Sequence, residues 1–165
     1  MKKTSTAKLT WNEDAFNRAL QETCRGKLAI VGITITNDVK ISFRGEKSGR
    51  QYVKNDGKIH TASAPGETPA IDTGRLRASI SYDVTDGKSG GATGQDPGVK
   101  AENYRWPVME VAVGTKVDYA LDLEFGRKPG EARPFLVPAL DRAVEPIKRI
   151  FSGQQVTIKG NTTEP

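Results

Sequence analysis

The sequence is poor in residues that support metal or nucleophile chemistry: its 165 residues include one cysteine, Cys24, and one histidine, His60. One cysteine excludes a disulfide within the chain and is typical of assembly in a reducing compartment. One histidine in a polar segment gives no metal-ligand spacing and leaves no nucleophile with an evident base. Four carboxylates could supply a catalytic pair but are expected to be helix caps and solvated charges: Glu110, Asp118, Asp122 and Glu124. We therefore expect no metal, no cofactor and no catalytic residue, and a protein that is not an enzyme.

Long apolar runs are absent as well. No stretch of about 18 apolar residues occurs, which predicts no membrane span. The basic start at Met1 continues into polar residues, so no signal peptide is expected. Hydrophobic residues make up 36% of the chain, enough for a packed core at this length. We expect one domain over residues 1–151 and a polar C-terminal tail over residues 152–165.

Neither sign of charge dominates, since 25 Lys and Arg residues stand against 20 Asp and Glu residues, a net charge of +5. This excess permits contact with DNA or an acidic partner without requiring either. The nearest approach to a basic and aromatic nucleic-acid surface is the set Arg75, Arg77, Tyr104 and Arg105. A stand-alone basic nucleic-acid-binding protein is therefore the alternative hypothesis.

The first 43 residues admit two interpretations. Apolar or small residues recur three or four positions apart and predict one long helix over Trp11–Phe43: Phe16, Leu20, Cys24, Leu28, Val31, Ile35 and Val39. The β-branched residues 33–43, interrupted by Asn37-Asp38, instead resemble a β-hairpin. The length of the stripe favours the helix, which we expect.

Two long segments lack an apolar period. Arg44–Asp72 contains several Gly and Pro residues and is expected to be a loop with one short strand near Tyr52. Asp86–Ala101 is rich in glycine and is expected to be a flexible excursion. We expect both segments to be mobile in the free protein and to gain order on assembly.

Regular elements are expected between and after these segments. Thr73 should cap a single helical turn, followed by a strand over Ser79–Thr85 that pairs antiparallel with a strand over Trp106–Gly114. A final amphipathic helix is expected over Pro134–Phe151, with Pro146 kinking or splitting it. The expected fold is α+β: a small antiparallel β-sheet packed by a long N-terminal helix and a C-terminal helix, with long loops.

The stretch Val117–Leu140 combines two helices with a charged turn. Asp118 is expected to cap a short helix and Gly126 to end it. No residue here forms a catalytic pair, so we interpret the stretch as a packing and docking unit. Three of its residues are expected to form the buried junction between the two helices and the sheet: Tyr119, Phe135 and Leu140.

Three segments occur in a familiar order: SAPGETPAIDTGRLRASI at 63–80, VAVGTKVDYALDLEFG at 111–126 and ARPFLVPAL at 132–140. Together they resemble the neck and tail-completion proteins of long-tailed bacteriophages, the family typified by the tenth gene product of a lambdoid siphophage. The positions that carry this resemblance are Thr73, Gly74, Leu76, Ser79, Gly114, Tyr119, Ala120, Glu124, Gly126, Pro134, Phe135, Pro138, Ala139 and Leu140. Family members more often have Thr after the second segment, where this chain has Arg127.

The resemblance implies a structural virion protein at the head–tail junction, assembled in the host cytoplasm. Such proteins form a homo-oligomeric ring between the head-completion or connector proteins and the tail tube or tail terminator protein. Transient contact with genomic DNA in the channel is implied as well. Four arginines are expected to pair with acidic groups on neighbouring subunits: Arg75, Arg77, Arg127 and Arg133.

Overall fold

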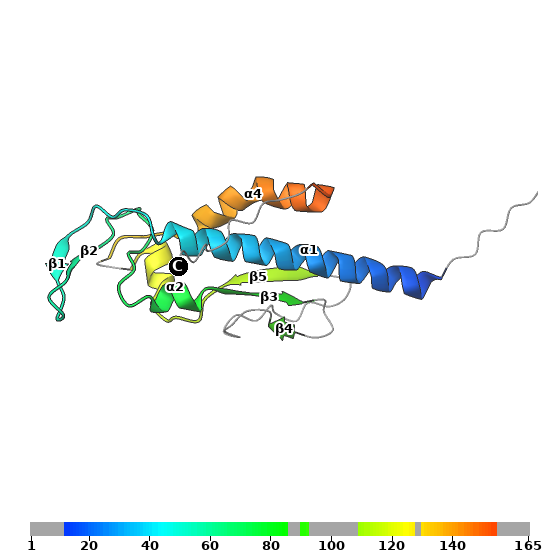
Figure 1. Cartoon of the computed structure of the whole chain (residues 1–165), viewed down its shortest axis with the longest axis horizontal. Coiled ribbons are helices and arrows are strands. Elements are labelled where there is room, and N and C mark those ends of the chain that lie inside the picture. The colour runs from blue at the N-terminus through cyan, green and yellow to red at the C-terminus, as the bar shows by residue number, and fades with distance from the viewer. Residues whose placement is uncertain (1–11, 86–89, 93–108, 128–129, 155–165) are drawn as a thin grey trace, which may run out of the picture.

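The computed structural model describes residues 12–85, 90–92, 109–127 and 130–154. The elements in chain order are α1 (Glu13–Ser42), β1 (Gln51–Val53), β2 (Ile59–Thr61), α2 (Arg75–Ser79), β3 (Ser81–Thr85), β4 (Gly90–Ala92), β5 (Glu110–Gly114), α3 (Ala120–Phe125) and α4 (Leu136–Ser152). The expected α+β fold with a long N-terminal and a C-terminal helix is confirmed (Figure 1). Within the described residues, no helix is long and apolar enough to cross a membrane.

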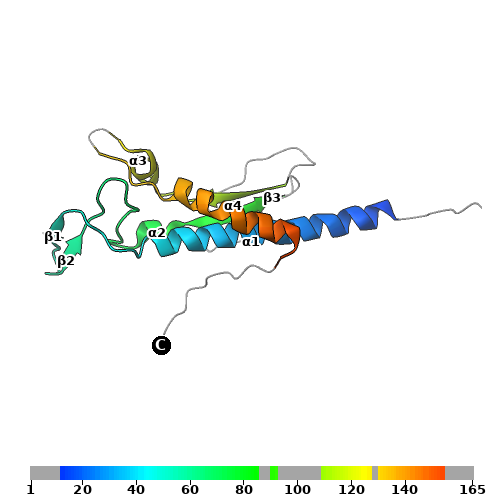
Figure 2. The same ribbon diagram turned by 90° about the horizontal axis from the view of Figure 1, so that it is seen from above.

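The elements form a sheet with helices on one side. The main sheet has the order β4-β3-β5 and is antiparallel throughout. Helix α1 packs against β3 and β5, and α4 packs against α1 (Figures 1 and 2). A second antiparallel sheet, β1-β2, projects beyond the end at which α1 finishes. The N-terminal turns of α1 extend past the other elements at the opposite end.

Helix α1 is continuous across the segment for which a hairpin was the alternative, so the helical prediction is confirmed. Its N-terminus is fixed by the Asn12 side chain, whose Oδ1 accepts a hydrogen bond of 3.0 Å from the Ala15 amide. Three side chains four positions apart, Val31, Ile35 and Val39, are at most 3% exposed. Their burial against the sheet and α4 outweighs the β propensity of this segment.

Glycine at position 32 sets how closely α1 approaches the sheet. A Cβ built there would lie 2.4 Å from Cδ2 of Tyr82 and 3.0 Å from Cγ2 of Val111. The backbone of α1 therefore rests directly on the tyrosine ring. Any larger residue would push the helix away from β3 and β5.

The antiparallel pairing of β3 with β5 is confirmed, with Tyr82 opposite Val113 and Val84 opposite Val111. The expected flexible excursion is corrected in part, because Gly90–Ala92 form β4 and pair with β3. Because glycine has no side chain, a strand made of glycines shows no alternation of apolar and polar residues, and the sequence did not predict it. The start of the expected second strand, residues 106–108, lies outside the described residues, as do Tyr104 and Arg105.

The segment Arg44–Asp72 is not a loop with a single short strand. It contains the hairpin β1–β2, and the Glu67 carboxylate accepts hydrogen bonds from Ser48 Oγ at 2.6 Å and the Ala64 amide at 2.8 Å. These bonds, led by that from Ser48 Oγ, lower the pKa of Glu67. Their stabilising contribution is therefore present above the ordinary glutamate pKa and is lost as the pH falls through the lowered value. Sequence periodicity missed this order because polar side chains and backbone groups supply it.

Of the two outcomes expected at Pro146, splitting is wrong, because α4 is one continuous helix, and a kink stays a prediction. Its buried face contains Ala139, Ala143 and Ile150, whose packing offsets the hydrogen bond that a proline removes. The apolar face of the helix is only partly buried. Three of its apolar residues are about half exposed: Leu140, Val144 and Phe151.

Replacing Gly32 by alanine tests the close approach of α1 to Tyr82. Alanine has the higher helix propensity, but overpacking should outweigh it, so we expect Gly32→Ala to lower the unfolding free energy by about 1–3 kcal/mol. Gly26→Ala is the matched control, since no atom lies within 4 Å of a Cβ there, and it should raise stability by about 0.5–1 kcal/mol. Urea unfolding of both variants measures the difference. Equal shifts of the same sign would contradict the packing described.

Candidate assembly interface

The segments that carry the family resemblance lie against one another. The hydroxyls of Ser79, the last residue of α2, and Thr115, which follows β5, share a hydrogen bond of 2.5 Å. Thr73, Gly74 and Leu76 line a cavity of about 460 Å³ together with Tyr119. The first and second segments are therefore joined at one place in the fold.

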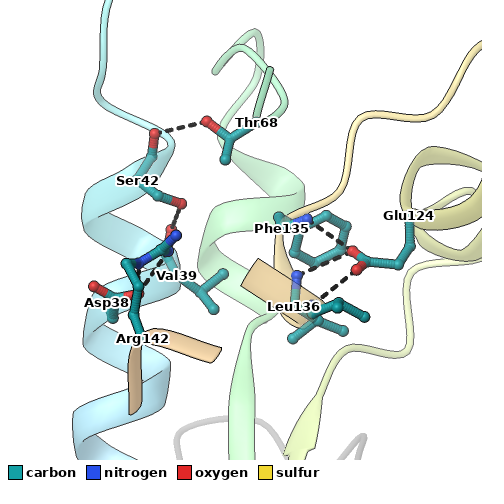
Figure 3. A network of polar contacts seen from close by, with 9 residues as sticks. Asp38, Val39, Ser42, Thr68, Glu124, Phe135, Leu136 and Arg142 are labelled. Atoms are coloured by element: carbon teal, nitrogen blue, oxygen red, sulfur yellow. Dashed lines mark hydrogen bonds and ion pairs between the residues drawn. The ribbon is translucent and has the colours of Figure 1, made fainter. Parts of the chain in front are cut away.

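The second and third segments are joined through Glu124 of α3, which is 6% exposed (Figure 3). Its Oε2 accepts hydrogen bonds from the amides of Phe135 at 2.8 Å and Leu136 at 3.0 Å, and its Oε1 accepts one from the amide of Val137 at 2.9 Å. The next residue, Pro138, has no N–H. Since the first four N–H groups of a helix lack partners within it, one carboxylate and one proline account for the whole start of α4. The negative charge also suits the positive end of the helix dipole.

The short helices begin differently from the sequence-based expectation. Asp118 does not cap α3, because the cap position is Tyr119 and no side-chain capping hydrogen bond is formed there. Helix α2 begins after Gly74 in the left-handed conformation, while the Thr73 hydroxyl accepts only the Arg75 amide at 3.3 Å. The prediction that Gly126 ends α3 is confirmed: its φ is 75°, and a Cβ would lie 2.9 Å from the Ala132 nitrogen.

The expected buried junction is correct for one of its three members. Phe135 is fully buried, and its ring lies 5.4 Å from the ring of Phe43 at the end of α1. Tyr119 is 42% exposed and Leu140 is 49% exposed, so neither belongs to the core. Phe43 packs against Phe135 in the core instead. The sequence did not indicate this, because Phe43 lies directly before the segment that lacks an apolar period.

Three of the four arginines expected at subunit contacts bond within their own chain. Arg77 Nε donates to the Lys40 carbonyl at 3.1 Å, and Arg133 Nε donates to the Ser63 carbonyl at 3.1 Å. Arg127 Nη1 pairs with Asp122 at 3.2 Å on the surface. The side chain of Arg75 is exposed beside the cavity at α2. Contacts of these arginines with neighbouring subunits stay a prediction.

An apolar groove of about 600 Å³, hereafter the α3–α4 groove, lies next to Glu124 and Phe135. Strand β5 contributes Val111 and Val113 to its lining, and α1 contributes Val31 and Ile35. The lining from α3 and α4 is the most exposed part: Leu121 at 66%, Phe125 at 69%, Val137 at 48% and Leu140 at 49%. The exposure of Leu121, Phe125 and Val137 was not predicted from the sequence, although α4 carries more apolar residues than one buried face requires.

The described residues contain no cluster of three or more His, Cys, Asp or Glu side chains that could hold a metal ion. Cys24 is half-buried on α1, and the His60 ring lies tilted against the Tyr52 ring with the centroids 5.1 Å apart. The candidate site therefore consists of the apolar α3–α4 groove and the backbone hydrogen bonds to Glu124. No family model, curated protein or solved structure matches this chain.

The Glu124 cap predicts a stability loss out of proportion to one surface carboxylate. Glu124→Ala leaves three amides at the start of α4 without their acceptor, and we expect a loss of about 2–3 kcal/mol. Glu145→Ala is the matched control on α4, because Glu145 is exposed and paired only with Lys148; it should cost less than about 0.5 kcal/mol. Thermal unfolding compares the two, and similar losses would show that the cap is dispensable.

Phe135 and Leu140 differ in burial although both belong to the third segment. Phe135→Ala should cost about 3–5 kcal/mol, since a fully buried ring is removed. Leu140→Ala should cost less than about 1 kcal/mol, because half of that side chain is already in water. Melting midpoints of the two variants test this, and an unchanged midpoint for Phe135→Ala would contradict the assignment of the core.

Proposed function

We propose that this protein is a structural virion protein of the head–tail junction of a long-tailed bacteriophage. In this proposal it forms a homo-oligomeric ring that joins the head-completion or connector proteins to the tail tube or tail terminator protein. The observation that carries the proposal is the union of the three resembling segments in one unit. They meet through Ser79–Thr115 and through the Glu124 cap, and the same unit lines an apolar groove.

The α3–α4 groove supports a role in assembly rather than in chemistry. Leu121 and Phe125 are about two-thirds exposed, and adjacent apolar residues of α4 enlarge the surface. Clustered apolar surface of this kind marks protein contact sites on soluble proteins. A ring further requires two different complementary surfaces on each subunit, because a head-to-tail contact repeats around the axis.

The four arginines differ in whether they are free to contact a neighbouring subunit. Arg75 and Arg127 are exposed, and an exposed pair such as Arg127–Asp122 is weak enough to exchange partners on assembly. Arg133 and Arg77 already donate to carbonyls of their own chain. We therefore propose Arg75 and Arg127 as the arginines that contact neighbouring subunits.

The proposal is tested by a charge placed in the groove. Electron microscopy of the purified wild-type protein should show rings, and Leu140→Asp should abolish them. It should also block complementation of a phage lacking this gene, so that tailless heads accumulate. Val144→Asp is the matched control: Val144 is also about half exposed on α4 but lies outside the groove, and it should leave rings and titre unchanged.

A monomeric wild-type protein that binds duplex DNA with strong salt dependence would instead favour the nucleic-acid-binding alternative, since each neutralised phosphate adds about 0.9 to the salt slope.

A further inference from the structure

The hairpin β1–β2 has an apolar face that no other described element covers. Val53 and Ile59 stand directly opposite each other in its register and are 68% and 70% exposed. The hairpin is a sheet of its own and projects from the body (Figures 1 and 2). An isolated two-stranded hairpin is marginally stable in water and needs a third strand or a hydrophobic support.

The α3–α4 groove offers what this hairpin lacks. Strand β5 is at the edge of the main sheet among the described strands, so one side of its backbone is open to pairing. Val111 and Val113 of that strand line the groove, with Leu121 and Leu140 nearby on the helices. A strand added to β5 would therefore place its side chains against apolar surface, as in peptide recognition by strand addition.

The charges of the two parts are complementary. Residues 44–61, which carry the hairpin, contain five basic and two acidic residues. Residues 110–125 and 135–145, which contain β5, α3 and the first half of α4, hold six acidic and two basic residues. Glu124 is buried, so five of the acidic residues are available to a partner. Opposite charge of this kind favours contact between the two parts and disfavours contact of either part with its own copy.

We infer that the hairpin of one copy adds to β5 of a second copy and places Val53 and Ile59 in the α3–α4 groove. This inference rests on the proposed ring and names its contact. Donor and acceptor are different surfaces of the chain, so the contact is head-to-tail and can repeat around a ring. The hairpin is smaller than the roughly 20–30 residues per side of a standard interface. Each copy in a closed ring makes two such contacts, so a ring is expected rather than a stable dimer.

Two variants and their mixture test the inference. The donor variant carries Val53→Ser and Ile59→Ser, and the acceptor variant carries Leu140→Asp; all three side chains are largely or half exposed, so folding should survive. Each variant alone should sediment as a monomer. Their equimolar mixture retains one intact contact and should give no ring, only a weak dimer that forms at high protein concentration. Leu20→Lys, at an exposed apolar residue of α1 remote from hairpin and groove, should leave the ring intact.

A disulfide trap provides a second measurement that does not depend on losing an interaction. In a Cys24→Ser background, which removes the only native cysteine, Ile59→Cys with Leu140→Cys should give covalent oligomers on mild oxidation. Leu20→Cys with Leu140→Cys should not.

The outcomes separate this inference from the proposed function. Rings that persist in the donor variant, together with no disulfide in the variant that carries Ile59→Cys and Leu140→Cys, would overturn the hairpin contact and leave the ring standing. Rings lost only with Leu20→Lys would identify α1 as the occupant and would also overturn it. A wild-type chain that stays monomeric, with no covalent oligomer in the trap, would overturn both the contact and the ring.

Discussion

The position of α4 depends on the carboxylate of Glu124. This carboxylate accepts hydrogen bonds from the amides of Phe135, Leu136 and Val137 and so fixes the residue at which α4 begins. That start places the Phe135 ring against Phe43 and sets α4 alongside α1, where Arg142 also bonds Asp38 at 2.7 Å (Figure 3). The groove beside α3 exists because α4 is held there. A buried interaction therefore determines the shape of an exposed surface.

The resulting layers are unequal in width. Two helices lie side by side, but the main sheet has three short strands in the described part of the chain, and its edge at β5 leaves apolar side chains of α3 and α4 in water. In the proposed ring, burying this surface against a neighbouring subunit would provide a driving force for association.

Much of the fold could be predicted from the sequence, and the misses share a cause. Helix α1 and the β3–β5 pair follow from side-chain periodicity, because their apolar residues repeat at helical or strand spacing. Strand β4 was missed because glycines pair through backbone groups alone. The side chains of Arg77, Arg133 and Glu124 likewise bond to backbone atoms. Every residue has such atoms, so the sequence does not reveal which residue will be the partner. The choice of Asp118 as a cap failed because a short helix between packed elements can begin without one.

The resembling residues and the proposed contact residues are largely different. Glu124, Gly126, Phe135 and Ala139 bond or pack inside the chain, so they specify where helices begin, end and cross. Leu121, Phe125 and Val137 on one side, and Val53 and Ile59 on the other, lie outside the pattern and face solvent. Substitutions in the first group should therefore disturb the fold, because these residues hold the helices in place. In the proposed ring, substitutions in the second group would instead change which neighbouring surface fits against the subunit.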